Sequence, residues 1–366
     1  MKILHLADGP QNIRAERAAL IAKTFGIKDH YIFGNILYDL LEKDIFKEKK
    51  YVELSRKNHY MFGLKEFNSI LMDYIEEVDP DIIHAHNIFF GNIALKLDLP
   101  LLYDDHELWT KSYKCHYYKG ILRKFSYLLK SYYYPRWERK LAKTKSVLVP
   151  SNGILKFYKT KYKSEKARLF PNMPLLSEVK KAKFQDRITD DLMTVTIGVS
   201  TKTLSKHRNV DGFIDLWKTN NDIGKLKIIG KSDIETSSKI ISTGKITHQD
   251  CYTEASAGHV GILPYRPYPQ FHKFSGANKA YLYIHSGLAL ITPRTQTEFN
   301  QVLEDVKYGT QFTYFDEVIS YLKKNKTKLM NLDRDQIMKV AREKYVLDNF
   351  SENLEISYEE VLENYK

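Results

Sequence analysis

The sequence predicts a two-domain α/β protein with a parallel sheet in each domain. Its 366 residues are too many for one comfortable hydrophobic core and suit two domains. Short apolar segments alternate with helical patterns along both halves, which is typical of parallel sheets covered by helices on both faces. Between the halves, residues 170–192 begin with the letters FPNMPLL and continue as a charged, irregular stretch. We expect the domain boundary there.

The first half contains several strand and helix units. Residues 1–8 hold the apolar run Ile3, Leu4 and Leu6 and end at Gly9-Pro10, which predicts a buried strand followed by a turn. A helix is expected around residues 18–22, closed by Gly26. Further units are expected as a helix at 64–77, a strand at 82–85, a helix at 93–97 and strands at 99–103 and 147–149.

The second half repeats this alternation. Short apolar segments predict strands at 194–198, 226–230, 260–263 and 288–291, and a helix is expected at 352–365. Ligands of open α/β sheets bind at the carboxyl ends of the strands, where loops meet helix amino termini. The default expectation is therefore a site between the two sheets.

Composition excludes several classes of protein. Cys115 and Cys251 lie far apart and belong to no metal-spaced or disulfide-like cluster, which fits a reducing, cytoplasmic setting. The amino terminus lacks the pattern of a secretory signal, and nowhere do about eighteen apolar residues run together. We expect neither export by that route nor a membrane span.

The positive charge is concentrated in one block. Residues 111–166 contain 16 Lys and Arg against two acids, whereas the whole chain has a net charge of +12. Tyr, Phe and Trp are interleaved with these cations, a composition that favours an anionic membrane interface. A plain solvated surface and a nucleic-acid surface are the alternatives. The residues expected to face the membrane are Lys119, Arg123, Lys124, Lys130, Arg136 and Trp137.

Ionisable side chains follow two of the predicted strands. The letters YDDHEL place Asp104, Asp105, His106 and Glu107 after an apolar segment, and HAHN places His84 and His86 on one face of another strand. The three histidines have the chemistry of zinc ligands, but no cysteine or carboxylate cluster completes a set, so we expect no metal. A role in binding a ligand at this strand end or in fixing the loop is the preferred interpretation of His84 and His86. An ordinary polar turn remains the alternative for the segment around His106.

Four segments together resemble the GT-B glycosyltransferases, and within them the family 4-like enzymes. They are DIIHAHN (81–87), LLYDDHEL (101–108), WERKLAKTKSVLVPSNGI (137–154) leading to LFPNMP (169–174), and VGILPY followed by NKAYLYIHSGLALIT (260–292). The resemblance implies two Rossmann-like domains, an acceptor-binding one at 1–170 and a nucleotide-sugar-binding one at 171–345. The ligand expected at His84 and His86 would then be the acceptor. It implies a last helix, 346–366, that crosses back to the first domain. It also implies no cofactor or metal beyond the nucleotide-sugar substrate.

The resemblance also assigns roles to individual residues. His106 matches the family histidine near the donor sugar, where Asp105 or Glu107 would orient it. A helix that begins around Ser275-Gly276 would present its N–H groups to the donor diphosphate. The other expected donor-binding residues are Gly9, Arg14, Lys202, Lys206, Arg208, Asn278 and Lys279.

The chain departs from the family at its paired glutamates. The alignment places Phe274 and Leu282 where the family has carboxylates near the reacting sugar and on the nucleotide ribose. A leucine cannot accept hydrogen bonds from ribose hydroxyls, so another group must do this or the donor is held differently. This departure motivates the alternative of a noncatalytic GT-B subunit that binds a partner or a glycan.

The expected protein is a cytoplasmic enzyme bound peripherally to the inner membrane face. It would move a hexose, with retention of configuration, from a UDP- or GDP-linked donor to a glycan or lipid-linked acceptor. Nucleic acid is not an expected partner.

Overall fold

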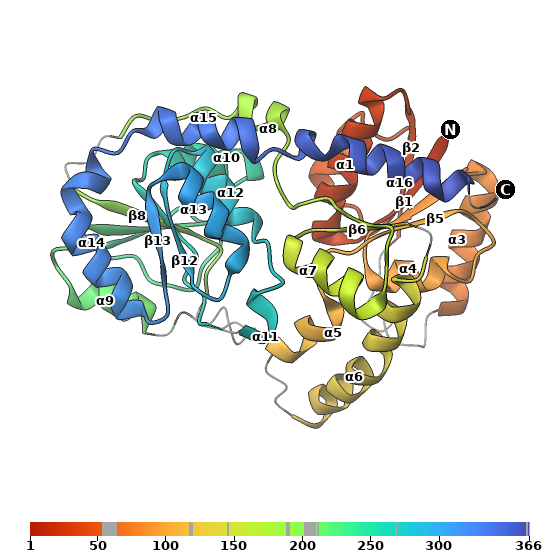
Figure 1. Cartoon of the computed structure of the whole chain (residues 1–366), viewed down its shortest axis with the longest axis horizontal. Coiled ribbons are helices and arrows are strands. Elements are labelled where there is room, and N and C mark those ends of the chain that lie inside the picture. Colours follow the sequence, from red (N-terminus) through yellow and green to blue (C-terminus); the bar gives the residue numbers. More distant parts are fainter. Residues whose placement is uncertain are drawn as a thin grey trace. The chain divides into compact units, whose positions relative to one another are not determined.

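The computed structural model confirms the predicted fold class (Figure 1). It describes residues 1–52, 64–116, 120–144, 146–187, 191–200, 210, 212–267, 269–363 and 365. The chain forms two compact units, each with its own parallel sheet. Unit 1 comprises Met1–Thr110, Leu128–Pro171 and Phe350–Lys366, and unit 2 comprises Lys111–Tyr127 and Asn172–Asn349.

Unit 1 is built on a seven-stranded parallel sheet with the order β3-β2-β1-β4-β5-β6-β7. Its strands are β1 (Lys2–Leu6), β2 (Asp29–Gly34), β3 (Glu48–Tyr51), β4 (Ile82–Ala85), β5 (Leu101–Asp104), β6 (Ser146–Val149) and β7 (Ala167–Leu169). Its helices are α1 (Asn12–Thr24), α2 (Tyr38–Leu41), α3 (Leu64–Val78), α4 (Ile88–Ala94), α7 (Asn152–Phe157) and α16 (Ser351–Glu363), with a π-helix at Tyr158–Tyr162. Two helices, α5 (Trp109–Ser112) and α6 (Ile121–Leu141), have residues in both units.

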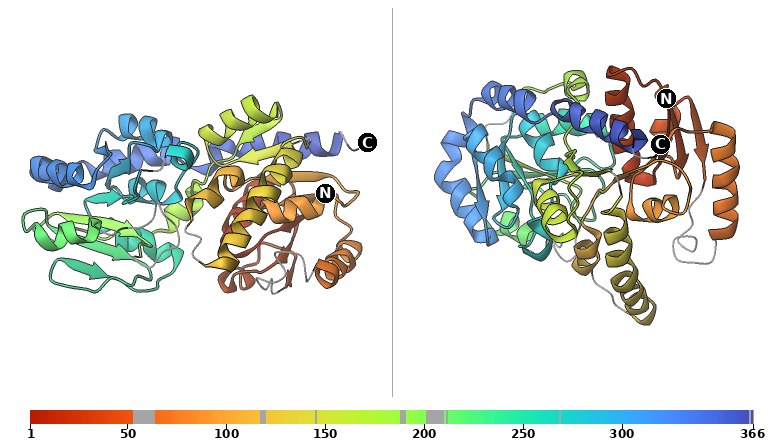
Figure 2. Two further views of the ribbon diagram at one scale, coloured as in Figure 1. Left: turned by 90° about the horizontal axis from the view of Figure 1, so that it is seen from below. Right: turned by 45° about the vertical axis from the view of Figure 1, so that its right-hand side comes forward.

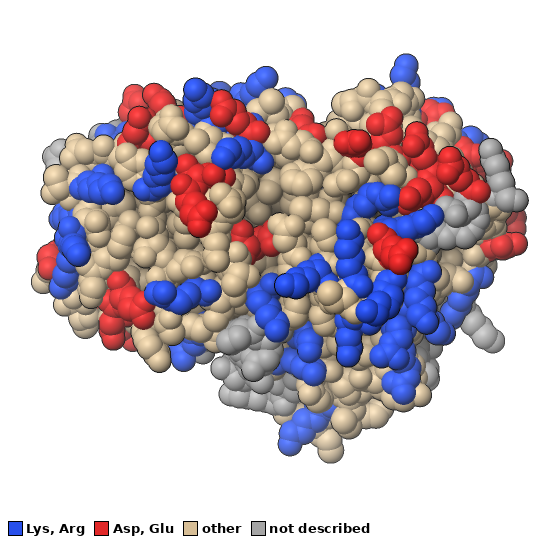
Figure 3. Space-filling view, in the orientation of Figure 1, with Lys and Arg blue, Asp and Glu red and all other residues tan. Residues whose placement is uncertain are grey.

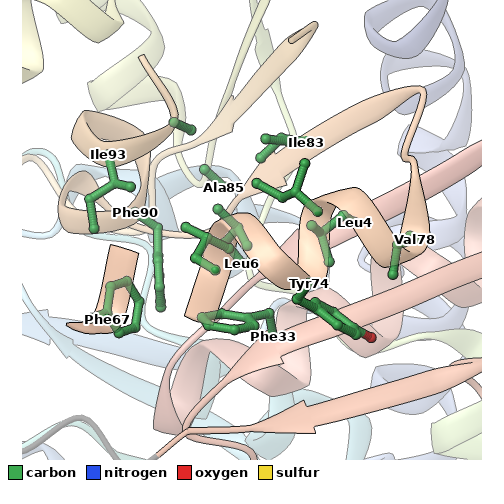
Figure 4. Close-up of a cluster of buried hydrophobic side chains, with 13 residues drawn as sticks. Leu4, Leu6, Phe33, Phe67, Tyr74, Val78, Ile83, Ala85, Phe90 and Ile93 are labelled. Carbon is green, nitrogen blue, oxygen red and sulfur yellow. The ribbon is translucent and has the colours of Figure 1, made fainter. Parts of the chain in front are cut away.

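Helices cover both faces of this sheet (Figures 1 and 2). On one face, alternate strand residues pack against α3 and α4 in an apolar cluster, because successive side chains of a strand point to opposite faces (Figure 4). The labelled members of this cluster are Leu4, Leu6, Phe33, Phe67, Tyr74, Val78, Ile83, Ala85, Phe90 and Ile93. The opposite face meets α1 and α16 and, unlike the first, carries polar side chains.

The last helix, α16, packs on the first sheet, as expected. It contacts β4, β5, β6 and β7. Its Glu360 forms a bidentate ion pair with Arg168 of β7, with N–O distances of 2.6 and 2.7 Å. Asn353 donates a hydrogen bond to the carbonyl of Leu169 at 2.8 Å. The end of the chain is therefore a structural part of unit 1.

Unit 2 contains a six-stranded parallel sheet with the order β10-β9-β8-β11-β12-β13. The strands are β8 (Met193–Ile197), β9 (Lys225–Ile229), β10 (Ile240–Ser242), β11 (Val260–Ile262), β12 (Ala289–Pro293) and β13 (Gly309–Phe312). The helices are α8 (Leu176–Lys181), α9 (Phe213–Thr219), α10 (His248–Ser256), α11 (Pro269–His272), α12 (Asn278–His285), α13 (Asn300–Val306), α14 (Phe315–Met330) and α15 (Arg334–Lys344).

None of the helices in the described residues is long and apolar enough to cross a membrane.

A close contact in unit 2 fixes α12 on its sheet. A Cβ atom built on Gly261 of β11 would lie 2.2 Å from the ring of Tyr283 in α12. The hydroxyl of Tyr283 accepts a hydrogen bond from the Ile197 amide and donates one to the Ile262 carbonyl. Only glycine allows the ring to lie flat on the strand at this point.

Gly261→Ala should destabilise unit 2 by about 1–3 kcal/mol, because the added methyl overpacks the contact with Tyr283. Urea unfolding of the single and double variants measures this effect. In a Tyr283→Ala background the ring is gone, so the same substitution should cost much less. An equal cost in both backgrounds would contradict this account of the contact.

Candidate active site

The sheet face under α1 and α16 in unit 1 carries a buried layer of histidines. His5 of β1 lies opposite His84 of β4 in the parallel register, and His86 follows two residues later on the same side. Asp104 ends the neighbouring strand β5, and all four side chains are fully buried. The alternation that sends Leu4 and Leu6 into the apolar cluster sends these polar groups to the other face.

Two of these histidines, His5 and His86, form a hydrogen-bonded relay with His30 of β2. His5 Nδ1 lies 2.9 Å from His86 Nε2, and His5 Nε2 lies 3.0 Å from His30 Nδ1. His30 Nε2 lies 3.1 Å from the carbonyl of Ile27, which can only accept a hydrogen bond. Burial lowers the pKa of His30 to about 4 and that of His5 well below its usual value, so both rings are neutral at pH 7.

A buried ion pair lies beside this layer. Arg14 of α1 donates to both carboxylate oxygens of Asp104, from Nε to Oδ2 at 2.6 Å and from Nη2 to Oδ1 at 2.7 Å. Arg14 also donates to the carbonyl of Phe170 and stacks over its ring. Burial alone would raise the pKa of Asp104, but the guanidinium and the neighbouring imidazoles hold it well below its usual range. The carboxylate is therefore ionised at neutral pH.

Three imidazole nitrogens face a single carboxylate oxygen. Asp104 Oδ2 lies 3.3 Å from His86 Nδ1, 3.7 Å from His84 Nε2 and 3.7 Å from His106 Nε2. His84 is held from behind by Tyr358 of α16, whose hydroxyl is 2.9 Å from Nδ1. His106 follows β5 and is the least buried of the three, at 12% exposure. The structure thus brings together His84, His86 and His106, as their strand-end positions suggested, and adds Asp104.

The carboxylate beside His106 is Asp104, not Asp105 as expected. Asp105 lies on the other side of the chain, because consecutive residues of an extended segment point in opposite directions. It accepts hydrogen bonds from Tyr158 at 2.8 Å and Tyr103 at 3.1 Å, and burial raises its pKa well above the usual value. Glu107 approaches it through its backbone amide. Asp105 therefore supports the loop from behind.

A second buried carboxyl belongs to Glu138 of α6. It accepts hydrogen bonds from the Tyr162 hydroxyl at 2.7 Å and from the amide and hydroxyl of Thr110. Burial raises its pKa to about 7. This network ties α6 to α5 and to the π-helix.

Gly9 and Arg14 lie at the carboxyl end of β1 but differ in accessibility. Gly9 has a φ of +52°, which favours glycine, and nothing lies within 4 Å of a Cβ built on it. Arg14 is only 4% exposed and is committed to Asp104 and Phe170. The Arg14 side chain therefore stabilises the histidine layer through Asp104. Its expected contact with the sugar donor stays a prediction.

A cavity of about 830 Å³ opens at the same end of the unit 1 sheet. Its walls come from α3, α4, α5 and α6, and are mainly apolar and aromatic with three lysines. The lining residues are Asp8, Gln11, Asn68, Leu71, Met72, Asn87, Ile88, Phe89, Asn92, Ile93, Lys96, Leu97, Trp109, Leu129, Lys130, Tyr133, Tyr134, Trp137 and Lys140. The cavity has the size and character of a small-molecule site.

In unit 2, Lys279 lies at the carboxyl end of β8. It donates to the carbonyl of Ile197 at 2.6 Å, and its Nζ would lie 3.4 Å from a Cβ built on Gly198. Helix α12 begins at Asn278 after Ala277, two residues later than expected, and Ser275 and Gly276 lie in the irregular segment before it. Lys202, Lys206 and Arg208 lie outside the described residues.

The residues that replace the family glutamates are part of the core of unit 2. Phe274 and Leu282 are 9% and 5% exposed. The ammonium group of Lys273 lies over the Phe274 ring, with Nζ 5.0 Å from the ring centroid.

The expected membrane residues gather on α6. Lys and Arg crowd the surface over α6 and α7 (Figure 3). Arg123, Lys124 and Arg136 are exposed, and Lys130 and Trp137 are half-buried in the cavity wall. Large apolar side chains are exposed beside them: Ile121, Leu122, Phe125, Leu128 and Tyr132. Lys119 lies outside the described residues.

Sequence reasoning missed His5, His30, Asp104 and Tyr358 as members of the layer. A signal was present for His5, which sits in the middle of an apolar strand where a polar side chain needs a partner. No comparable signal marks Tyr358, which is 274 residues from its partner His84.

Comparison with known proteins finds one family profile that matches part of the chain, and a fold shared with solved structures. Residues 42–173 match the sequence profile of Glycosyltransferase Family 4. A search of curated proteins by sequence found no match.

Solved structures match over the whole chain. Sucrose-phosphate synthase from Thermosynechococcus elongatus aligns with a TM-score of 0.74 and 13% identity over 100% of both chains. HepE from Anabaena, solved in complex with UDP-glucose, aligns with a TM-score of 0.66 and 13% identity over 98% and 99%. WaaG, a glycosyltransferase involved in lipopolysaccharide biosynthesis, gives 0.59 and 14% over 96% and 95%. These likenesses establish a shared two-unit fold.

The raised pKa of Glu138 predicts a pH-dependent stability. The folded state binds the Glu138 proton more tightly than the unfolded state, in which the pKa is near 4.5. This contribution is complete below pH 4.5 and is lost as the pH rises through about 7. Urea unfolding at several pH values measures this effect. In Glu138→Gln the free energy of unfolding should vary with pH by up to about 3 kcal/mol less than in the wild type. Glu165→Gln, at an exposed position, should leave the profile of the wild type unchanged; an unchanged profile in Glu138→Gln would refute the assignment.

Proposed function

We propose that the chain, which has the GT-B fold, is a family 4-type glycosyltransferase that transfers a hexose from a nucleotide-diphosphate donor to a lipid-linked or glycan acceptor. The proposal includes retention of the anomeric configuration and action at the inner face of the cytoplasmic membrane. The observation that carries the acceptor part is the apolar, lysine-bearing cavity of unit 1.

Unit 2 offers the groups that a nucleotide diphosphate requires. Lys279 lies beside Gly198 at the end of β8, where a cation neutralises phosphate charge. The segment with Ser275 and Gly276 leads into α12, whose first N–H groups have no intrahelical partners and suit an anion. In the transfer step these groups would stabilise the charge that develops on the departing diphosphate. The likeness to HepE, which was solved with UDP-glucose bound, supports a UDP-linked donor.

In unit 1, His106 is the side chain best placed to act on the transferred sugar. It lies at the edge of the histidine layer, and its side chain is partly exposed to solvent. It lies beside the carboxylate of Asp104, which is fixed by Arg14. Burial lowers its pKa well below the usual value, so the ring is neutral at pH 7 and can both donate and accept hydrogen bonds with sugar hydroxyls. His84 and His86 are fully buried, so they would support the acceptor region through the layer without touching the acceptor.

The cavity supports an amphipathic acceptor. Its aromatic side chains Trp109, Tyr133, Tyr134 and Trp137 offer apolar surface, whereas Lys96, Lys130 and Lys140 offer charge for phosphate groups. A lipid-linked sugar phosphate combines these two properties. Since Lys130 and Trp137 belong to both the cavity wall and α6, the same helix would hold the acceptor and the membrane.

Helix α6 supports membrane contact at its exposed surface. Ile121 and Leu122 are 84% and 82% exposed, next to Arg123 and Lys124. Apolar side chains of this kind are expensive to leave in water and enter the headgroup region, where the adjacent cations meet anionic lipids.

A noncatalytic subunit is the second candidate. It is favoured by the burial of Phe274 and Leu282, which leaves neither position able to bind a ribose or a sugar. Such a subunit would show neither donor hydrolysis nor thermal stabilisation by any nucleotide sugar.

Substitutions at His106 and Lys279 should separate transfer from nucleotide binding. His106→Ala should lower sugar transfer and donor hydrolysis by at least about 100-fold and leave UDP affinity within about twofold. Lys279→Ala should weaken UDP binding by about 10- to 100-fold, since it removes a charged hydrogen bond. Turnover with a panel of nucleotide sugars and calorimetry with UDP measure both effects. The exposed His248→Ala is the matched control; full turnover in His106→Ala would contradict its role.

Charge reversal on α6 should release the protein from membranes. Lys124→Glu with Arg136→Glu should weaken binding to phosphatidylglycerol vesicles by at least about 30-fold, from about 1 kcal/mol per cation removed. Vesicle co-sedimentation measures this. Lys324→Glu with Lys339→Glu makes the same change of net charge on exposed residues of unit 2 and should retain binding. Equal loss in both variants would show a nonspecific charge effect, and strong salt-sensitive DNA binding by the wild type would favour a nucleic-acid surface instead.

A further inference from the structure

The histidine relay of unit 1 ends in a hydrogen-bond acceptor on both sides, and its imidazoles carry too few N–H protons to make every hydrogen bond along it. The relay runs from the Ile27 carbonyl through His30, His5 and His86 to Asp104, which makes four links. The carbonyl and the ionised carboxylate can only accept, so each link needs a proton from an imidazole. Three neutral imidazoles supply three protons. One link must therefore hold two facing lone pairs or an added cation.

The distances identify which link this is. Three of the links measure 2.9, 3.0 and 3.1 Å, which are ordinary hydrogen bonds. The fourth, from His86 Nδ1 to Asp104 Oδ2, is the longest at 3.3 Å. With His30 donating to the carbonyl, each ring in turn donates toward Ile27, and His86 Nδ1 is left with a lone pair that faces the carboxylate.

Two further ring nitrogens converge on the same carboxylate oxygen. His84 Nε2 and His106 Nε2 each lie 3.7 Å from Asp104 Oδ2. Within the described part of the chain, neither these two nitrogens nor His86 Nδ1 has a hydrogen-bond partner. Unpaired polar atoms at this depth are rare in folded proteins. A single proton can satisfy only one of the three nitrogens.

The geometry fits a metal ion better than a proton. Tetrahedral Zn²⁺ binds imidazole and carboxylate at about 2.0–2.2 Å, so neighbouring ligand atoms lie about 3.4 Å apart. The distances of 3.3 and 3.7 Å to Asp104 Oδ2 are close to this edge length. The ligand atoms of His86, Asp104 and His106 all lie within 4.8 Å of one another, and a small rotation of His106, the least buried of them, would close the set.

We propose that His86, Asp104 and His106 bind a divalent transition-metal ion of the zinc type, with His84 as a fourth ligand. The ligand set of imidazoles and one carboxylate is the set that Zn²⁺, Co²⁺ and Ni²⁺ favour. The relay through His5 and His30 then orients His86, and Tyr358 orients His84, in the manner of outer partners that fix metal-bound histidines. The proposal departs from the sequence-based expectation of no metal, which rested on the lack of a cysteine or carboxylate cluster beside the histidines and on the family resemblance.

Arg14 limits how tightly the ion binds. Its guanidinium uses one lone pair of each Asp104 oxygen and leaves a second lone pair on Oδ2. It also places a positive charge next to the metal position, and like charges in a buried site repel strongly. The Arg14 side chain and the metal therefore compete for the same carboxylate. Because of this competition, removal of Arg14 should strengthen metal binding, which is not expected of a chance surface site.

Titration of the purified, metal-stripped full chain with CoCl₂ and ZnCl₂ tests the proposal. One equivalent of Co²⁺ should give the intense visible bands of a four-coordinate ion. Excess Zn²⁺, at 100 times its dissociation constant, should raise the Tm by about 5 °C. His106→Asn should weaken binding by at least about 100-fold and abolish the visible bands. His248→Asn, on the exposed surface of α10, should keep both signals.

A second variant distinguishes this site from an adventitious one. Arg14→Gln removes the competing cation, so it should bind Co²⁺ at least about tenfold more tightly than the wild type. Zn²⁺ should also raise its Tm more than that of the wild type, because the metal replaces the lost partner of the buried Asp104. The Arg14→Gln result does not depend on how His106→Asn folds.

Three outcomes would overturn the proposal. They are weak six-coordinate Co²⁺ spectra with no change in Tm, binding that His106→Asn leaves intact, or binding that Arg14→Gln weakens. The first would assign the link between His86 and Asp104 to a proton. The metal titration and the sugar-transfer assay have separate readouts: transfer is judged by the turnover of His106→Ala and the UDP affinity of Lys279→Ala, and neither measurement requires added metal.

Discussion

The ion pair between Arg14 and Asp104 is the interaction on which unit 1 depends most. It joins α1 to the end of β5, and through the Phe170 carbonyl it reaches the segment after β7. Both partners are almost fully buried, so removal of either leaves an uncompensated charge, a change that typically costs about 3–5 kcal/mol. The carboxylate in turn is the point toward which three histidines converge. The ion pair therefore fixes the carboxylate around which His84, His86 and His106 are arranged.

The fold was largely predictable because its signals are local. Apolar alternation located β1, β4, β5, β6, β8, β9, β11 and β12, and helical spacing located α3 and α16. The strands that escaped prediction are β2 and the four edge strands β3, β7, β10 and β13. β3, for example, reads EKKY and has no apolar signature, since an edge strand has a solvated side. β7 has three residues, fewer than a pattern needs to be recognised. The expected domain ranges 1–170, 171–345 and 346–366 stay predictions; the two compact units differ from them chiefly in that Lys111–Tyr127 belongs to unit 2.

The site was only partly predictable, because its contacts are long-range. Period-two spacing placed His84 and His86 on one face, but nothing local indicated that the face lies under α1 and α16. Arg14 and Asp104 are 90 residues apart, and the choice between Asp104 and Asp105 depended on which residue ends β5. The loop around Lys206 and Arg208 lies outside the described residues, so its donor roles stay predictions.

The place of α16 in unit 1 has a consequence for how the protein is made. Unit 1 is completed by residues 350–366, which leave the ribosome only after all of unit 2. Until then the sheet face with His84 lacks Tyr358, Leu354 and Val361, and its buried polar groups stand open to water. Domains usually fold in the order of their synthesis. Here the second unit has to fold while the first is unfinished, so a nascent chain that stops before residue 350 should keep the histidine layer exposed to solvent and to chaperones.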